Sequence, residues 1–442
     1  MTRYSGSDLR EWRRSRGWDV PELARQLRRA STEPVAAHDA LVRMIRAWER
    51  GDHRPSERYE LLYHKLGLIP PADNDQPKAQ PTPIASQEDD DPVRRRTFVE
   101  LTAISATATL LPAPAGTRPP LDTEPLALAL TAQMTGTPPE PTQEPPGIPA
   151  LTLSVTRART HYQACRYAEL ITRLPYLLAQ LDAACGSLDG DGKLRACALA
   201  ADAYHLAAGI LLKTGDHGLA HLATDRSMTA ALASQDPLTV GTSARIVTHT
   251  LASSGHLPAA IATARNHSQR LDRQTGTQTP ESLSVYGSVL LRGALAAAQH
   301  DDRATAHEML AEAAGAARRL GTDANLRGTA FGPVNAQLHQ VNVAVTLGDA
   351  GTAIDLARQV DPAAITVTER KASLLIDVAQ AFFQWGKYGQ ACTALRAAEQ
   401  TAPQELAARA PVRTLARNLA TLAPPGLRRD AAHLADRIGA YT

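Results

Sequence analysis

Aromatic residues are scarce in this chain of 442 residues, where Phe, Trp and Tyr together make up 4%. Sheets rely on aromatic and β-branched side chains to fill their faces, whereas Ala and Leu, which dominate here, suit closely packed helices. We therefore expect an all-α protein. A chain of this length is expected to form two or three domains.

Cysteine is equally sparse: Cys165, Cys185, Cys197 and Cys392 form no C-x-x-C pair and have no regular spacing. We expect reduced core thiols in a cytoplasmic protein. No apolar run reaches the roughly 20 residues that a membrane span needs, and the N-terminus begins with a polar stretch. We therefore expect neither a secretory signal there nor a membrane partner.

The chain also lacks a strong overall charge, since its formal net charge is +2. This excludes a polyelectrolyte that binds nucleic acid along its whole length. The charge is unevenly placed, however. Residues 1–68 contain 14 Arg and Lys against 10 Asp and Glu, whereas residues 69–92 contain one Lys and six acids. A basic head followed by an acidic tether favours a head that binds nucleic acid.

One short amphipathic helix is predicted over residues 39–51. Its apolar residues Leu41, Ile45 and Trp48 recur at i, i+4 and i+7, so this face should be buried. Another face carries arginines at i, i+3 and i+7, namely Arg43, Arg46 and Arg50. Such a stripe suits phosphate oxygens and the N7 and O6 atoms of guanine. Gly51 can adopt the left-handed conformation that ends a helix.

The run from Ile45 to Gly51, followed by Pro55, resembles the end of the recognition helix in Cro/repressor-type helix-turn-helix regulators of the Xre family. Residues 9–13, 18–24 and 59–63 resemble the other helices of that domain. One departure is the connection of about ten residues before the recognition helix, where about four are usual.

The resemblance implies that residues 1–68 bind an operator in double-stranded DNA, as part of a homodimer. Arg43 and Arg46 would read bases, and Arg50 would contact phosphate. His38 and Arg54, at the two ends of the helix, complete the predicted contact set. The alternative is a helical packing module whose arginines are solvated. The predicted core of the head comprises Trp12, Leu23, Leu27, Leu41, Ile45, Trp48, Leu61, Leu62 and Leu66.

Residues 69–149 are rich in proline and are predicted to be a linker with a short helix near 94–111. Residues 94–116 have the composition of a twin-arginine export signal, but a complete domain precedes them. A short amphipathic helix that docks on the repeats or on a partner is the alternative that we favour. A second short helix is predicted over residues 124–135.

Residues 150–442 are predicted to form an α-solenoid. The clearest unit runs from Ala379 to Pro403, with a turn at Gly386 and a small residue, Ala391, where the helices cross. This unit resembles a tetratricopeptide repeat. The same frame fits turns at Gly215, Gly255 and Gly348 with Ala220, Ala260 and Ala353, and more poorly Asp301 with Ala306. Residues 151–190 and 404–442 should cap the two ends.

The whole chain resembles cytoplasmic regulators that join a Cro-type head to a helical-repeat sensor. This architecture occurs in peptide-sensing quorum regulators of Gram-positive bacteria and in actinobacterial regulators. The first helix of each repeat lines the concave groove in such solenoids. Taking offsets from the turns, the predicted ligand-binding residues are Asn335, Leu338, Asn342, Gln380, Phe383, Arg245 and His249.

The asparagine amides in this set could pair with the N–H and C=O groups of an extended peptide. Arg245 and His249 could hold a terminal carboxylate. The alternative is that Asn335 and Asn342 cap helices or are solvated.

Catalytic signatures are missing: no nucleophile elbow, phosphate-binding glycine loop or paired-carboxylate motif occurs. His217, His221 and Asp225 could share one helix face, but one such cluster is poor support for a metal. We therefore expect no enzyme, no cofactor and no metal. The leading hypothesis is a DNA-binding transcriptional regulator whose repeats dimerise and sense a peptide, small molecule or protein. The alternative is a repeat scaffold that binds a protein partner and uses the head for docking.

Overall fold

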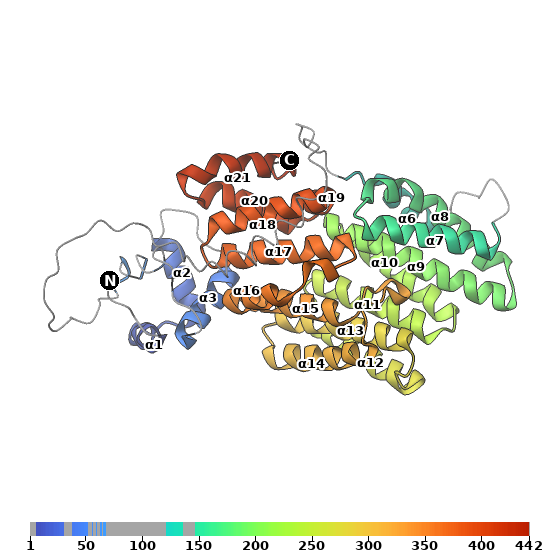
Figure 1. Cartoon of the computed structure of the whole chain (residues 1–442), viewed down its shortest axis with the longest axis horizontal. Helices are drawn as coiled ribbons and strands as arrows, with labels where there is room; N and C mark the ends of the chain where they lie inside the picture. The colour runs from blue at the N-terminus through green and yellow to red at the C-terminus, as the bar shows by residue number, and fades with distance from the viewer. Residues whose placement is uncertain are drawn as a thin grey trace, which may run out of the picture.

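The computed structural model describes residues 6–30, 38–51, 121–135 and 146–441, with a few single positions between 55 and 67. Every regular element in these ranges is helical and none is a strand, as Figure 1 shows. This confirms the expected all-α class. The predicted helix near 94–111, and the twin-arginine stretch that contains it, lie outside the described residues.

The head contains α1 (Gly6–Ser15), α2 (Val20–Ala30) and α3 (His38–Arg50) around a small core. Of the predicted core residues, Leu23, Leu27, Leu41, Ile45, Trp48 and Leu62 are buried, Trp12 and Leu66 are partly buried, and Leu61 is outside the described residues. The sequence interpretation missed Leu9, Tyr59 and Tyr63, which are buried in the same cluster. The two tyrosines pack on Trp48, with ring centroids 5.0 and 6.2 Å from its ring.

Six consecutive helical hairpins form the body of the repeat region. They are α7 (Ile148–Gln163) with α8 (Tyr167–Ser187), α9 (Gly190–Thr214) with α10 (His217–Ala233), α11 (Pro237–Ser253) with α12 (Leu257–Thr275), α13 (Pro280–Gln299) with α14 (Arg303–Leu320), α15 (Pro333–Thr346) with α16 (Ala350–Gln359), and α17 (Thr368–Gln384) with α18 (Tyr388–Thr401). Each helix packs on the next along the chain, so the arrangement is repeat-like.

The same turn closes each hairpin. Gly215, Gly255, Gly348, Gly386 and Asp301 all have positive φ, and the residue after each donates its N–H to the carbonyl five residues back at 2.9 Å. This is the hydrogen bond of a Schellman C-cap. The alanine five residues after each turn, from Ala220 to Ala391, is fully buried. The predicted frame of a turn followed by a small crossing residue is therefore confirmed.

The first hairpin has this turn without its usual residues. Cys165 has φ +57°, and Arg166 donates its N–H to the His161 carbonyl at 2.9 Å, as in the other five turns. Leu170 takes the crossing position and is buried. Residues 151–190 were predicted as an atypical cap, and they form this hairpin. Its turn has the backbone conformation of the other turns, but Cys165 and Leu170 replace the usual glycine and alanine.

Helices outside the six hairpins extend the core at both ends. α6 (Glu124–Met134) confirms the short helix predicted over residues 124–135, and, although this range was predicted as linker, Leu126 and Leu130 are fully buried in one cluster with α7, α8 and α9. At the other end follow α19 (Pro403–Ala408), α20 (Ala410–Leu422) and α21 (Pro425–Arg437). Within the repeat region, the short 3₁₀ turns η1 (Leu326–Gly328) and η2 (Pro362–Ala364) precede α15 and α17. Among the described helices, only α9 is long and apolar enough to cross a membrane, and 72% of its most apolar window is buried inside the protein.

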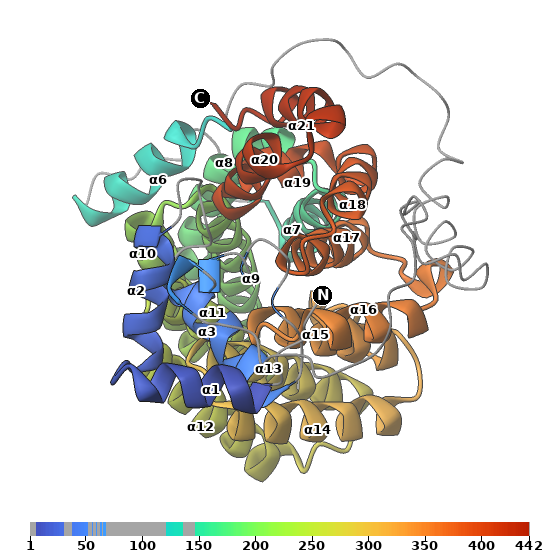
Figure 2. The same cartoon turned by 90° about the vertical axis from the view of Figure 1, so that its left-hand side faces the viewer.

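The two ends of the repeat region contact each other. We call Tyr167, Lys213, Glu369, Glu405 and Arg409 the closure cluster. Lys213 Nζ lies 3.0 Å from Glu369 Oε1 and 2.7 Å from Glu405 Oε1, while the Tyr167 hydroxyl donates to Glu405 and Arg409 pairs with both glutamates. In Figure 2 the helices α9, α11, α13, α15, α17 and α7 accordingly follow one another around a circuit.

Candidate functional site

Helix α3 separates an apolar face from an arginine face. Leu41 and Ile45 are fully buried in the head core, whereas Arg46 and Arg50 are exposed and Arg43 is half-buried. These exposures place the arginine stripe outside the core, where it could reach a nucleic acid. His38 is the first residue of α3, but its side chain and the whole of Arg54 lie outside the described residues.

The position of α3 is fixed by a buried ion pair that the sequence interpretation missed. Arg13 on α1 donates from Nε to Glu49 Oε1 at 2.5 Å and from Nη2 to Glu49 Oε2 at 2.8 Å. Both side chains are buried, and hydrogen bonding to Glu49 raises the pKa of Arg13. Glu49 follows Trp48 directly, so this Trp-Glu pair places one side chain in the core and the other against α1. The sequence feature that could have indicated this ion pair is the arginine, Arg13, on the first predicted helix.

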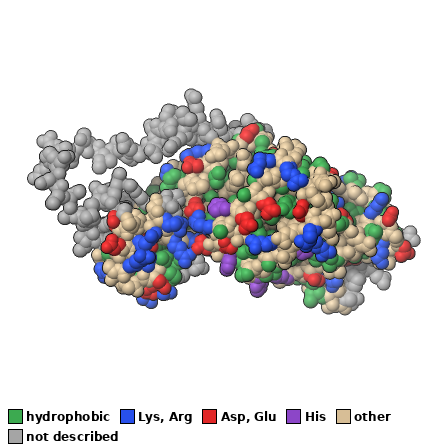
Figure 3. All heavy atoms as spheres, turned by 90° about the horizontal axis from the view of Figure 1, so that it is seen from below, with side chains coloured by type: hydrophobic (Ala, Val, Ile, Leu, Met, Phe, Trp, Pro, Cys, Tyr) green, Lys and Arg blue, Asp and Glu red, His purple; other side chains and the backbone are tan. Residues whose placement is uncertain are grey.

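The arginine face of α3 is turned toward the repeat region. Arg46 Nη1 lies 2.5 Å from Oδ2 of Asp301, in the turn between α13 and α14. Arg43 lies beside the turn between α15 and α16, because a Cβ built on Gly348 would lie 3.7 Å from its Cβ. Figure 3 shows basic side chains of the head gathered where it meets the repeats. Arg46, which the sequence predicted to read a base, therefore forms an ion pair with another part of the same chain.

A cavity lies inside the circuit of the repeats, and we call it the inner cavity. It holds about 650 Å³ of empty space, counting the part open to solvent. Its polar wall comes mainly from the first helices of successive hairpins: Arg159, Tyr162 and Gln163 of α7, Asp202 and His205 of α9, Thr242, Arg245 and His249 of α11, Arg292 of α13, and Glu369 and Arg370 of α17, with Arg327 from η1.

Positive charge exceeds negative charge on this wall, with five arginines against two acids. Three arginines have a carboxylate partner: Arg159 and Arg327 lie 2.6 Å from Asp202 and Asp236, and Arg370 lies 3.5 Å from Glu369. Arg245 and Arg292 form no ion pair with any residue that the structure describes. Burial, and then the neighbouring arginines, lower the pKa of Arg245 to about 9 and that of Arg292 to about 10.

The histidines beside these arginines are held neutral. Burial, followed by the nearby arginine charges, lowers the pKa of His205 and His249 well below the usual value, and lowers that of His339 to about 3. Arg245 Nη2 lies 2.9 Å from His205 Nε2, so Nε2 is the unprotonated nitrogen of this neutral ring. The wall therefore gathers cations and neutral donors around one space.

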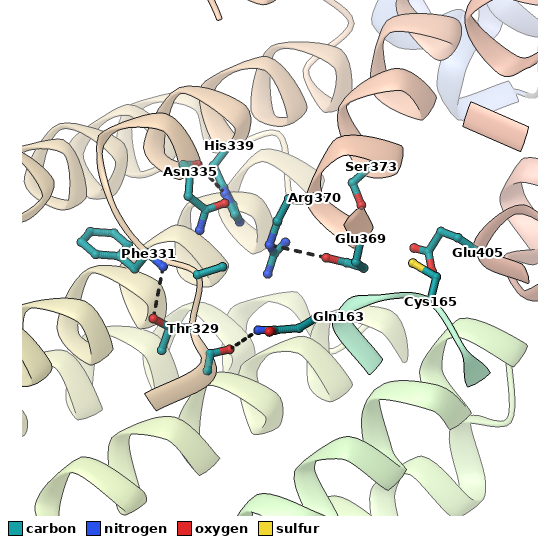
Figure 4. Close-up of polar contacts among 12 residues, drawn as sticks. Gln163, Cys165, Thr329, Phe331, Asn335, His339, Glu369, Arg370, Ser373 and Glu405 are labelled. Carbon is teal, nitrogen blue, oxygen red and sulfur yellow. Dashed lines mark hydrogen bonds and ion pairs between the residues drawn. The ribbon is translucent and has the colours of Figure 1, made fainter. Parts of the chain in front are cut away.

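Three buried polar atoms of this region have no hydrogen-bond partner: Arg245 Nε, His205 Nδ1 and Asn335 Oδ1. Asn335 is only 4% exposed. Figure 4 shows Asn335 and His339 on α15 pointing toward the same space as Arg370, across from Gln163. Leaving such groups without partners costs stability, so they are typical of a binding site.

The predicted ligand-binding residues do not all meet at this cavity. Arg245 and His249 line it, and Asn335 lies beside Arg370 at its edge. Leu338 is buried in the core instead, and Phe383 packs on Tyr388, with ring centroids 5.7 Å apart. Asn342 donates to Asp377 Oδ1 at 2.7 Å, so that donor is already used. Gln380 and Asn342 are half-buried and are not part of the cavity wall.

No group of three His, Cys, Asp or Glu residues that could hold a metal ion occurs in the part of the chain that the structure describes. His221 of the histidine pair on α10 lies 2.9 Å from Ser254 Oγ through its Nε2. Comparisons with models of protein families and with curated proteins found no match to this chain.

Proposed function

We propose that this protein is a DNA-binding transcriptional regulator whose repeat region senses a ligand. The head is a helix-turn-helix domain of the Cro/repressor type, α3 is its recognition helix, and the hairpins are tetratricopeptide-like. The observation that carries the proposal is the face of α3 opposite its buried residues, where Arg43, Arg46 and Arg50 form one stripe. Guanidinium groups in such a stripe can donate two hydrogen bonds to guanine or to a phosphate.

The contact between Arg46 and Asp301 supports a regulated form of this activity. An arginine cannot pair with Asp301 and read a base at the same time, so DNA and the repeat region compete for α3. We propose that the conformation described here is the DNA-free one. A ligand in the repeat region that favours the undocked head would shift the population toward DNA binding. Homodimerisation through the repeats would present two heads to an operator.

The same contact also favours the alternative, a scaffold in which the head is a docking module. In that case α3 would hold the head on the repeats, and its arginines would contact no nucleic acid. The two functions differ in one measurable property, sequence-specific binding to duplex DNA.

The test uses the full chain to select binding sequences from a random pool of duplex DNA, followed by gel shifts with the selected site. We expect Arg43→Ala and Arg46→Ala to lose about 1–3 kcal/mol of discrimination per lost guanine contact. Arg50→Ala should weaken binding to all sequences alike. Arg14→Ala, which removes an exposed arginine of α1, is the control. Failure to enrich any sequence would favour the scaffold.

A further inference from the structure

We propose that the inner cavity binds a small ligand through a compact oxyanion, a phosphate or a carboxylate, held between Arg245 and Arg292. This inference rests on the proposed sensing role of the repeat region and names the chemistry of its effector. The sequence predicted that Arg245 and His249 hold a terminal carboxylate. The site proposed here is centred instead on Arg245 and Arg292, which come from neighbouring hairpins.

The other cations around the cavity each have a carboxylate partner, and these two arginines have none in the part of the chain that the structure describes. In the closure cluster, two cations face two glutamates, and each of Arg159 and Arg327 has its own aspartate. Arg370 shares Glu369 with Lys213 and Arg409. No acid is left for Arg245 and Arg292 among the described residues. An anion brought from outside would supply the missing charge.

Burying unpaired cations among other arginines is unfavourable, because desolvation and repulsion between like charges both oppose it. The lowered pKa values of both guanidinium groups have these two causes. A protein gains nothing in stability from such a pair in its empty state, whereas a bound anion makes the pair favourable. Sites of this kind are typical of binding, where stability is given up for function.

The remaining polar groups suit a ligand that carries one oxyanion on a polar body. Arg245 keeps Nε without a partner, and Tyr162 supplies a hydroxyl group on the same wall, whereas the Thr242 hydroxyl already donates to the Leu238 carbonyl. Gln163 is hydrogen-bonded to Asn325 at 3.0 Å at the outer edge. Arginine forks bind phosphate and carboxylate in the same bidentate geometry, so both oxyanions fit this site.

The experiment measures thermal unfolding of the full chain with inorganic phosphate, succinate or trialanine, each compared with sodium chloride at equal ionic strength. The three probes separate a phosphate, a small carboxylate and a peptide C-terminus. We expect at least one of them to raise the melting temperature of the wild-type protein saturably beyond the salt control. Arg292→Gln should abolish that shift. Arg273→Gln, which alters an exposed arginine of α12, should keep it.

A second readout separates a binding role from a structural one. Without any probe, Arg292→Gln should melt at the wild-type temperature or above it, because the variant removes an unpaired cation. Arg245→Gln should behave in the same way, and it tests the site independently should Arg292→Gln fail to fold. The inference is overturned if no probe exceeds the salt control, or if Arg292→Gln, Arg245→Gln and Arg273→Gln all respond like the wild type.

Failure of this inference differs from failure of the proposed function. Anion binding is read without DNA, and DNA selection is carried out without added anion. A wild-type protein that is stabilised by a probe but enriches no DNA sequence keeps the anion site and loses the regulator. One that enriches a sequence but is stabilised by no probe keeps the regulator and loses this effector chemistry.

Discussion

At the scale of single residues, Asp377 of α17 is an acid that keeps its proton to nearly neutral pH. Burial raises the pKa of Asp377 to about 7, although the hydrogen bond from Asn342 acts in the opposite direction. The same carboxyl in the unfolded chain titrates near its ordinary value of about 3.9. Between these two values the folded protein holds a proton that the unfolded chain has lost.

Stability should therefore fall as the pH rises from about 4 to about 7, with a contribution from this group of up to about 1.4 kcal/mol per pH unit. Asp377→Asn keeps an acceptor for Asn342 and carries no charge, so it should raise the free energy of unfolding by more at pH 8 than at pH 5. Urea unfolding at both pH values measures this. The exposed Asp436→Asn is the control, and equal pH profiles for the two variants would contradict the assignment.

At the scale of helices, α1 and α3 are joined by the buried pair of Arg13 and Glu49. Removing one partner of a buried pair leaves the other charge unpaired and costs about 3–5 kcal/mol. Glu49→Ala should thus unfold the head at a temperature where the repeats stay folded. Tryptophan fluorescence reports this selectively, since Trp12, Trp18 and Trp48 lie in the head and only Trp385 lies in the repeats. The double change Arg13→Met, Glu49→Leu should recover part of the loss.

Crossing positions within the hairpins have no spare space. Ala306 on α14 is fully buried where the helix crosses α13, so Ala306→Leu should cost about 1–3 kcal/mol through overpacking. Ala311→Leu in the same helix points outward and should change stability little. Chemical denaturation of the two variants compares them directly. Equal midpoints would mean that α13 and α14 are not packed closely at Ala306.

The sequence predicted those elements whose signals are local. Turns at Gly215 or Gly386 and their buried alanines follow from neighbouring residues, so they were predictable. The hairpin turn at Cys165 was not, because its backbone conformation is imposed by packing and not by a glycine. Asn342 was assigned to a ligand since its partner, Asp377, is 35 residues away. The unpaired state of Arg292 depends on five other helices, which no local pattern reveals.

At the scale of the whole molecule, the head and the repeats share α3 through the ion pair of Arg46 and Asp301. Both side chains are substantially exposed, 45% and 37%, so the pair is worth about 0.2–1 kcal/mol. If docking competes with DNA, Asp301→Asn should tighten DNA binding by roughly 1.4- to 5-fold. Asparagine tolerates the positive φ of this position, so the turn should survive.

Gel shifts on the selected site measure this change in affinity. Asp302→Asn removes the same charge one residue along the chain, where asparagine can still cap α14, and it should leave affinity unchanged. Equal effects of the two substitutions would point to the general field of the turn and not to the pair with Arg46.

The closure cluster also limits how the repeat region can change in evolution. In an open array each hairpin contacts only its neighbours, so whole repeats can be inserted or deleted without harm to distant ones. Here an added or lost hairpin between Lys213 and Glu369 would carry Glu405 and Arg409 away from Tyr167 and Lys213. Buried charges would then lose their partners at both ends. The number of hairpins between these points is consequently fixed by the geometry of the circuit.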